Sequence, residues 1–208
     1  MSSQLRPIRW SARGLARASI PIPAIFLDRD GVILENRDDY VKSFKEAVFV
    51  PGALAALTRL ADSPFRVVVA TNQAQVGRGI IPLAEAEAIN QWVVDEVAGA
   101  GGRIDAAYLC PHAPDDGCDC RKPRPGMLLD AASDLRLDLS RSLIIGDAIT
   151  DLQAGEAAAV RALLVRTGRG ATQEELLVAH ALGHVSVYAD LAAAVEGFLT
   201  QDRDVVAA

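Results

Sequence analysis

The chain has 208 residues, half of them hydrophobic, with a formal net charge of -6 and a pI of about 5.1. This size favours one domain with a substantial core. The acidic balance lacks the broad positive field that nonspecific binding to nucleic acid requires. No run approaches the roughly 18 apolar residues that span a bilayer, and the start lacks the apolar core of a secretion signal. We therefore expect a cytoplasmic protein that binds neither nucleic acid nor membranes.

The start of the chain differs in composition from the remainder, because residues 1–24 contain arginines and no acidic residue. Such a segment fits a disordered extension, an organelle targeting peptide or an incorrectly chosen start codon. Pro21 and Pro23 make a natural boundary. We predict a flexible extension over residues 1–23, a folded domain over 24–200 and a tail over 201–208.

Apolar runs alternate with stretches of helical spacing along the folded part. The runs that read as buried strands cover residues 24–27, 66–70, 106–109, 143–145 and 162–165, with a last strand after His184. The helical stretches cover residues 52–61, 83–98, 125–135, 152–159 and 191–199, the last with Asp190 as its cap. This order predicts an α/β fold whose parallel sheet has helices on both faces.

Polar residues follow three of these apolar runs. Asp28, Thr71 and Asp147 each lie at or just past the end of a predicted strand. In parallel sheets the binding crevice lies at the carboxyl ends of the strands. The predicted fold therefore brings these three residues to one edge.

Asp28 and Asp30 lie two residues apart directly after a strand, and Gly31 permits a sharp turn there. One carboxylate of such a pair can attack phosphorus while the other moves a proton, and both suit Mg²⁺ as hard oxygen ligands. A solvated acidic turn is the alternative, since Asp and Gly are ordinary turn residues.

Three further segments supply what phosphoryl transfer needs. Thr71, Asn72 and Gln73 offer a hydroxyl, amides and backbone N–H groups to phosphate oxygens. Lys122 offers a positive charge, and Asp147 a carboxylate for a metal ion. Each residue also has an ordinary explanation, as a helix cap, a surface charge or a turn. Their joint occurrence in this order favours the functional interpretation.

The motifs DxDGV, TNQ, a lysine and GDxxxD, in that order, resemble those of the haloacid dehalogenase superfamily. The resemblance implies a Rossmann-like α/β fold in which Asp28 forms an aspartyl-phosphate and Asp30 acts as general acid and base. It implies that Thr71 and Lys122 stabilise the phosphoryl group. It also implies Mg²⁺ held by Asp28, by the backbone carbonyl of Asp30 and by Asp147.

The three cysteines of the chain lie close together, in Cys110-Pro111-His112 and Cys118-Asp119-Cys120. Three thiolates and one imidazole make the closed tetrahedral set that structural Zn²⁺ prefers. The alternatives are one disulfide with a spare thiol, or three free cysteines. Arg121 and Lys122 follow directly, so a zinc clamp would position both cations. Arg121 could contact a second phosphate of the substrate, or it could be an exposed surface charge.

The combination of DRDGV, TNQ, CPH, CxCRKPxPGM and GDxxxD resembles the heptose bisphosphate phosphatases and the related histidinol-phosphate phosphatases, which lack a large cap domain. The resemblance implies a phosphatase for a small phosphorylated metabolite. We expect a monomer in which Asn72, Gln73 and Arg121 bind the substrate. Ala148 departs from the pattern, because some heptose enzymes carry a substrate-binding lysine there. A zinc-stabilised binding module that has lost catalysis is the alternative of another class.

Overall fold

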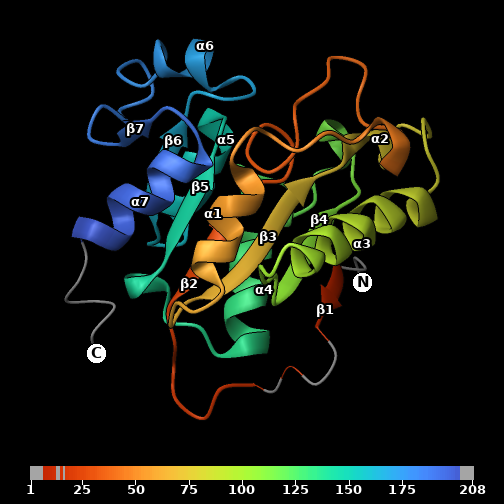
Figure 1. Ribbon diagram of the computed structural model, residues 1–208. Coiled ribbons are helices and arrows are strands. Elements are labelled where there is room, and N and C mark those ends of the chain that lie inside the picture. Colours follow the sequence, from red (N-terminus) through yellow and green to blue (C-terminus); the bar gives the residue numbers. More distant parts are fainter. Residues whose placement is uncertain (1–6, 13–14, 16, 202–208) are drawn as a thin grey trace.

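The computed structural model describes residues 7–201 except 13, 14 and 16, and within these ranges it contains one seven-stranded sheet (Figure 1). The strands lie in the order β1-β4-β3-β2-β5-β6-β7. Their bounds are β1 Ile8–Ser11, β2 Ala24–Leu27, β3 Arg66–Asn72, β4 Ala106–Cys110, β5 Leu143–Gly146, β6 Arg161–Val165 and β7 Ser186–Tyr188. All neighbours from β4 to β7 pair in parallel. The predicted parallel α/β sheet is confirmed.

The edge strand β1 is antiparallel to β4, with Ile8 opposite Leu109 and Ser11 opposite Ala106. This part of the chain was expected to belong to a flexible extension that ends at residue 23. The structure differs from that expectation because the backbone of residues 8–11 completes hydrogen bonds at the open edge of β4. The described part of the predicted tail is limited to residue 201, and residues 202–208 lie outside the described residues.

Helices cover both faces of the sheet, as predicted (Figure 1). One face carries α1 Ala53–Leu60, α3 Leu83–Gly99 and α7 Leu191–Gln201, and the other carries α4 Gly126–Leu135 and α5 Ile149–Ala157. Side chains alternate across β2, since Ile25 and Leu27 join the first core while Phe26 joins the second. A strand buried on both faces reads as a continuous apolar run, which is why this run was recognisable in the sequence.

The connections at the carboxyl ends of the strands contain no cap domain within the described residues. Between β2 and α1 lies a loop with the 3₁₀ turn η1 Phe44–Glu46, and between β3 and α3 lies the short helix α2 Ala74–Gly77. The 3₁₀ turns η2 Pro114–Asp116 and η3 Leu139–Arg141 and the helix α6 Gly170–Glu174 complete the elements. None of the described helices is both long and apolar enough to cross a membrane.

Element boundaries differ from the predictions in two places that matter for the site. Strand β3 extends to Asn72, so Thr71 belongs to the strand and not to a helix start. Helix α5 begins at Ile149, three residues before the predicted start at residue 152, so Asp151 lies in its first turn. The predicted cap of α7 is confirmed, because the Ala193 N–H donates to Asp190 Oδ1 at 2.8 Å.

Candidate active site and metal centres

Three buried aspartates from two chain segments meet at the carboxyl ends of the central strands. Asp28 follows β2, Asp147 follows β5, and Asp151 lies in the first turn of α5. Their carboxylate oxygens lie within 4.8 Å of one another. The convergence expected for Asp28 and Asp147 is therefore present, and Asp151 joins them.

Two glycines make this close approach possible. Gly31 has a φ of 96°, and a Cβ on it would lie 2.1 Å from Asp147 Oδ2. Gly168 has a φ of 59°, and its Cβ would lie 2.3 Å from the same oxygen. Because real Cβ atoms never approach so closely, and because L-residues avoid this backbone region, both positions require glycine.

Lys122 reaches the acids from the segment that follows the cysteine loop. Its Nζ lies 2.9 Å from Asp28 Oδ1 and 2.6 Å from Asp151 Oδ1, and it donates to the Ala70 carbonyl at 2.6 Å. Burial alone would lower the pKa of Lys122, but the carboxylates of Asp151 and Asp28 outweigh burial and raise it. The lysine is thus held charged beside the acids.

The acids are short of positive charge. Burial raises the pKa of Asp28 to about 7, against the lowering effect of Lys122. Burial, followed by the charge of Asp151, raises the pKa of Asp147 to about 6. Among the described residues, the buried Oδ1 of Asp147 has no hydrogen-bond partner. The three carboxylates face one buried ammonium group, and the exposed guanidinium group of Arg169 lies 3.7 Å from Asp147 Oδ2. Negative charge is therefore in excess, so the donor set fits a divalent cation with oxygen ligands such as Mg²⁺.

Asp30 lies beside this group but outside it. Its two carboxylate oxygens accept hydrogen bonds from Arg29 at 3.0 and 2.9 Å, and Gln73 Nε2 donates to Oδ2 at 2.8 Å. The side chain of Asp30 is 21% exposed and lines the cavity described below. Its carboxylate is thus available to a substrate while the metal-type group is built by other residues.

The TNQ segment is used differently from the prediction. Thr71 lines the cavity, whereas Gln73 is fully buried, and its side chain bonds to Thr71, Asp30, Arg29 and Gln75. The expected substrate contact of the Gln73 side chain is therefore not supported, because its neighbours occupy the amide.

The side chain of Asn72 fixes the backbone that carries the catalytic-site lysine. Its amide donates to the Lys122 carbonyl at 3.0 Å, and its oxygen accepts from the Lys122 N–H at 3.1 Å. Asn72 also lines the cavity, so the predicted contact with substrate remains open to it.

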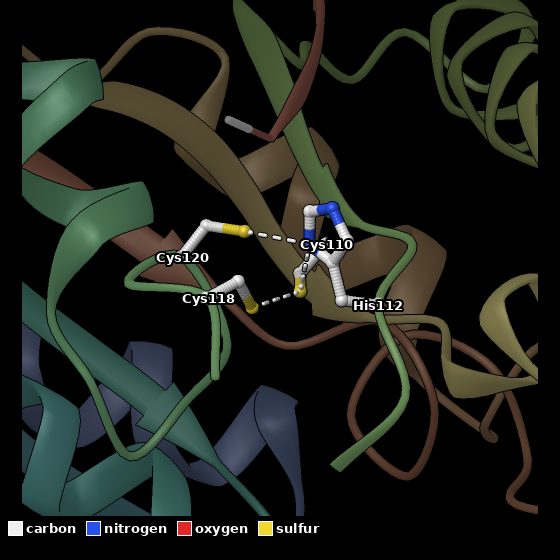
Figure 2. A group of neighbouring side chains, drawn as sticks. All are labelled: Cys110, His112, Cys118 and Cys120. Atoms are coloured by element: carbon white, nitrogen blue, oxygen red, sulfur yellow. Dashed lines mark hydrogen bonds between the residues drawn. The ribbon is translucent and has the colours of Figure 1, made fainter. Parts of the chain in front are cut away.

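The cysteine loop gathers four side chains around one point, as Figure 2 shows. Cys110 is the last residue of β4 and His112 follows it, while Cys118 and Cys120 lie in the loop after η2. The distances are 3.5 Å from Cys110 Sγ to His112 Nδ1, 3.6 Å from Cys110 Sγ to Cys118 Sγ, and 3.3 Å from His112 Nδ1 to Cys120 Sγ.

These distances suit one tetrahedral ion. Zn–S bonds of about 2.3 Å and Zn–N bonds of about 2.0 Å give edges of about 3.5–3.8 Å in a tetrahedron, so the observed 3.3–3.6 Å would need to open by only about 0.2 Å. All three cysteines are free, so the alternative of a disulfide is not found. The contact between Cys110 and Cys120 lowers the pKa of Cys110 to about 5 and raises the pKa of Cys120, so it favours one thiolate, on Cys110. The group could hold Zn²⁺.

The cysteine loop is continuous with the acid group through residues 120–122. Arg124 Nη1 donates to the Cys118 carbonyl at 2.5 Å, and Arg121 Nη1 donates to the His112 carbonyl at 3.3 Å. The Asn72 side chain, in turn, forms hydrogen bonds with the backbone N–H and carbonyl of Lys122. A metal ion in the loop would thus restrain the segment that delivers Lys122 to Asp28.

A cavity of about 350 Å³ opens above Asp28 and Lys122. Its wall includes arginines from four separate segments, which are Arg37, Arg78, Arg121 and Arg169. Asp38 is a carboxylate at the same rim, while Arg37 is paired with Asp39 at 3.2 Å. Positive charge therefore predominates where the remainder of a substrate would lie.

Comparison with known proteins identifies the family. Residues 119–194 match the family model described as HAD-hydrolase-like. The D-glycero-beta-D-manno-heptose-1,7-bisphosphate 7-phosphatase of Pseudomonas aeruginosa is 44% identical over 146 residues, which cover 70% of this chain and 82% of that protein. The chain belongs to the HAD-like hydrolases. It is a phosphatase.

Two further relatives extend the match over most of the chain. The 7-phosphatase of the same name from Photorhabdus laumondii is 38% identical over 85% of this chain and 96% of its own length. A crystal structure of the D,D-heptose 1,7-bisphosphate phosphatase from B. bronchiseptica, complexed with magnesium and phosphate, superposes with a TM-score of 0.81. It is 41% identical and covers 86% of this chain and 99% of its own. The resemblance to this superfamily is confirmed, as is the capless α/β fold.

Proposed function

We propose that the chain hydrolyses the 7-phosphate of D-glycero-beta-D-manno-heptose 1,7-bisphosphate. The observation that carries the proposal is the cavity, in which a nucleophile and a lysine lie below a rim of arginines. Such a rim suits a substrate with a second phosphate. The names of the relatives in Pseudomonas aeruginosa and Photorhabdus laumondii support the same substrate.

The proposed reaction has two steps in which Asp28 and Asp30 divide the work. Asp28 attacks phosphorus, and an oxygen–phosphorus bond forms as the ester bond breaks. Asp30, as the acid, gives its proton to the leaving alcohol oxygen. Asp30 then takes a proton from a water that attacks phosphorus, which releases phosphate and restores both side chains.

Lys122 and Thr71 hold the phosphoryl group during both steps. The ammonium group of Lys122 already lies 2.9 Å from Asp28, and the Thr71 hydroxyl lines the same cavity. Mg²⁺ held by Asp28, Asp147 and the Asp30 carbonyl would supply further positive charge to the phosphoryl oxygens. The close carboxylates and the unpartnered Asp147 Oδ1 support this ion.

The cysteine loop is proposed to hold one structural Zn²⁺ through Cys110, His112, Cys118 and Cys120. A shell filled by four protein ligands leaves no place for a reacting water. Its contribution is therefore the position of Arg121 and Lys122. We further propose, from the acidic composition, a monomeric cytoplasmic enzyme without nucleic-acid or membrane partners.

The substrate is tested by phosphate release from both anomers of heptose 1,7-bisphosphate and from histidinol phosphate, with Mg²⁺ present. Histidinol phosphate is the main rival, and its positively charged half would meet an arginine rim. We expect kcat/KM for one bisphosphate anomer to exceed that for histidinol phosphate by at least about 100-fold. A higher value for histidinol phosphate would overturn the substrate, and no turnover of any ester would favour an inactive binding module.

A further inference from the structure

A fully buried arginine lies between the two reacting aspartates. Arg29 is 0% exposed and is among the largest fully buried side chains of the described residues. A charge removed from water must be met by several acceptors, so its partners report what it is built to hold. The proposed chemistry uses Asp28 and Asp30 and assigns nothing to Arg29.

The guanidinium group grips the proposed general acid with two parallel hydrogen bonds. Arg29 Nε donates to Asp30 Oδ1 at 3.0 Å, and Nη2 donates to Asp30 Oδ2 at 2.9 Å. This fork fixes both the place and the rotation of the carboxyl plane, which a single contact would not do.

Two amides anchor the guanidinium group in turn. Nη1 donates to Asn90 Oδ1 at 2.7 Å, and Nη2 donates to Gln73 Oε1 at 2.8 Å. Asn90 lies on helix α3 and Gln73 follows strand β3, and both side chains are buried. Asp30 is thereby tied to two elements of the rigid core, although it lies in a loop.

The same network leaves one oxygen of Asp30 for the proton. Oδ2 accepts from both Arg29 and Gln73 Nε2, the latter at 2.8 Å, and these bonds use its two lone pairs. Oδ1 accepts from Arg29 Nε and keeps a second lone pair. The acid proton would then be carried on Oδ1.

We propose that Arg29 is a positioning residue for Asp30, and that it sets the orientation from which Asp30 gives its proton to the leaving oxygen. The proposal rests on the proposed function of Asp30. Arg29 acts through Asp30, because Arg29 is fully buried and is not among the residues that line the cavity, whereas Asp30 is.

The dependence of the rate on the leaving group separates positioning from general damage. The leaving group of heptose bisphosphate is a primary alcohol, which needs a proton. The leaving group of 4-nitrophenyl phosphate is a stable phenolate, which does not. The quantity to compare is kcat/KM, which covers formation of the aspartyl-phosphate. For Arg29→Lys, which keeps the charge and removes the fork, we expect a loss of about 10- to 100-fold with the sugar ester and under about threefold with the phenyl ester.

A double-mutant cycle tests whether Arg29 acts through Asp30. Asp30→Asn should lose activity selectively with the sugar ester. Adding Arg29→Lys to Asp30→Asn should then cost less than about twofold, because the group that Arg29 positions no longer gives a proton. Asn90→Ala removes one anchor and should show the same selectivity as Arg29→Lys, at smaller size.

Asp105→Asn is the matched control, because Asp105 is also buried and ion-paired. It lies just before β4 and contacts Arg66 at 2.9 Å and Arg103 at 3.1 Å. This substitution should lower the melting temperature without any leaving-group selectivity. Equal losses of Arg29→Lys on both esters, or full additivity with Asp30→Asn, would overturn the positioning role. If Asp30→Asn itself showed no selectivity, the proposed acid would be wrong instead. If the wild type did not hydrolyse the heptose ester, mannose 6-phosphate would take its place in the same comparison.

Discussion

The acid group at the strand ends and the cysteine loop beside it offer different kinds of ligand atom to a metal ion. Asp28, Asp147 and Asp151 offer carboxylate oxygens, of which the buried Oδ1 of Asp147 has no hydrogen-bond partner among the described residues. They lie next to a cavity of about 350 Å³. The cysteine loop offers three sulfur atoms and one imidazole within 4.8 Å of one another, which is the number of ligands that fills the shell of a tetrahedral ion. The difference indicates that the acid group is suited to chemistry on a substrate and the cysteine loop to holding the backbone in place, although residues 120–122 connect them.

The sharpest way to break this comparison is to remove the charge of the nucleophile. Asp28→Asn keeps the size of the side chain, so we expect an unchanged melting temperature and a loss of turnover of at least about 10⁴-fold. Phosphate release and a thermal melt measure both. Asp62→Asn, on the surface, is the control. Undiminished release from a folded Asp28→Asn protein would refute the role.

Asp147→Asn tests the divalent cation at the acid group. One carboxylate fewer should weaken Mg²⁺ binding and cost about 10²- to 10³-fold in kcat/KM at moderate Mg²⁺. Titration of activity with Mg²⁺ should show partial recovery at high concentration. An unchanged Mg²⁺ dependence would exclude Asp147 as a ligand.

Cys118→Ser should reduce the stability of the protein and disturb the position of Lys122, without removing any group that reacts. We expect about one zinc per chain in the wild type, little in the variant, and a stability loss of several kcal/mol. Because Lys122 loses its restraint, we expect activity to fall about 10- to 100-fold. Elemental analysis and thermal melts check this, with His184→Gln as the control that keeps zinc. Native wild-type protein without zinc and with titratable thiols would contradict the zinc loop.

Arg78→Ala should have the smallest effect, since Arg78 lies at the exposed rim and bonds to the Tyr40 hydroxyl. We expect KM for heptose bisphosphate to rise about three- to tenfold while kcat changes little, because solvent screens an exposed charge. Arg59→Ala, on α1 and paired with Glu196, is the control. A fall in kcat without any change in KM would show that the rim does not bind the second phosphate.

The sequence predicted the sheet and much of the site, because both have local signals. Strands buried on both faces appear as apolar runs, and the polar residues that follow them mark the edge where they meet. The pairing of Cys110 and His112 with Cys118 and Cys120 is likewise a matter of short spacing.

Long-range contacts account for what the sequence did not predict. Strand β1 is short and half-exposed, and only the open edge of β4 makes it a strand. No local signal marked Arg29, because its partners include Asn90, far along the chain on α3. Gln73 was expected to bind substrate, since nothing local indicates that Arg29 and Asp30 occupy its amide.

The most direct test is to trap the phosphorylated enzyme during turnover. Acid quenching within the first turnovers, followed by peptide mass spectrometry, should find one added phosphoryl group on the peptide that contains Asp28. The cysteine-loop peptide should be unmodified, and Asp28→Asn should abolish the signal. A phosphoryl group on any other residue would contradict the account that these strand ends surround one phosphorus atom with Asp28 as its nucleophile.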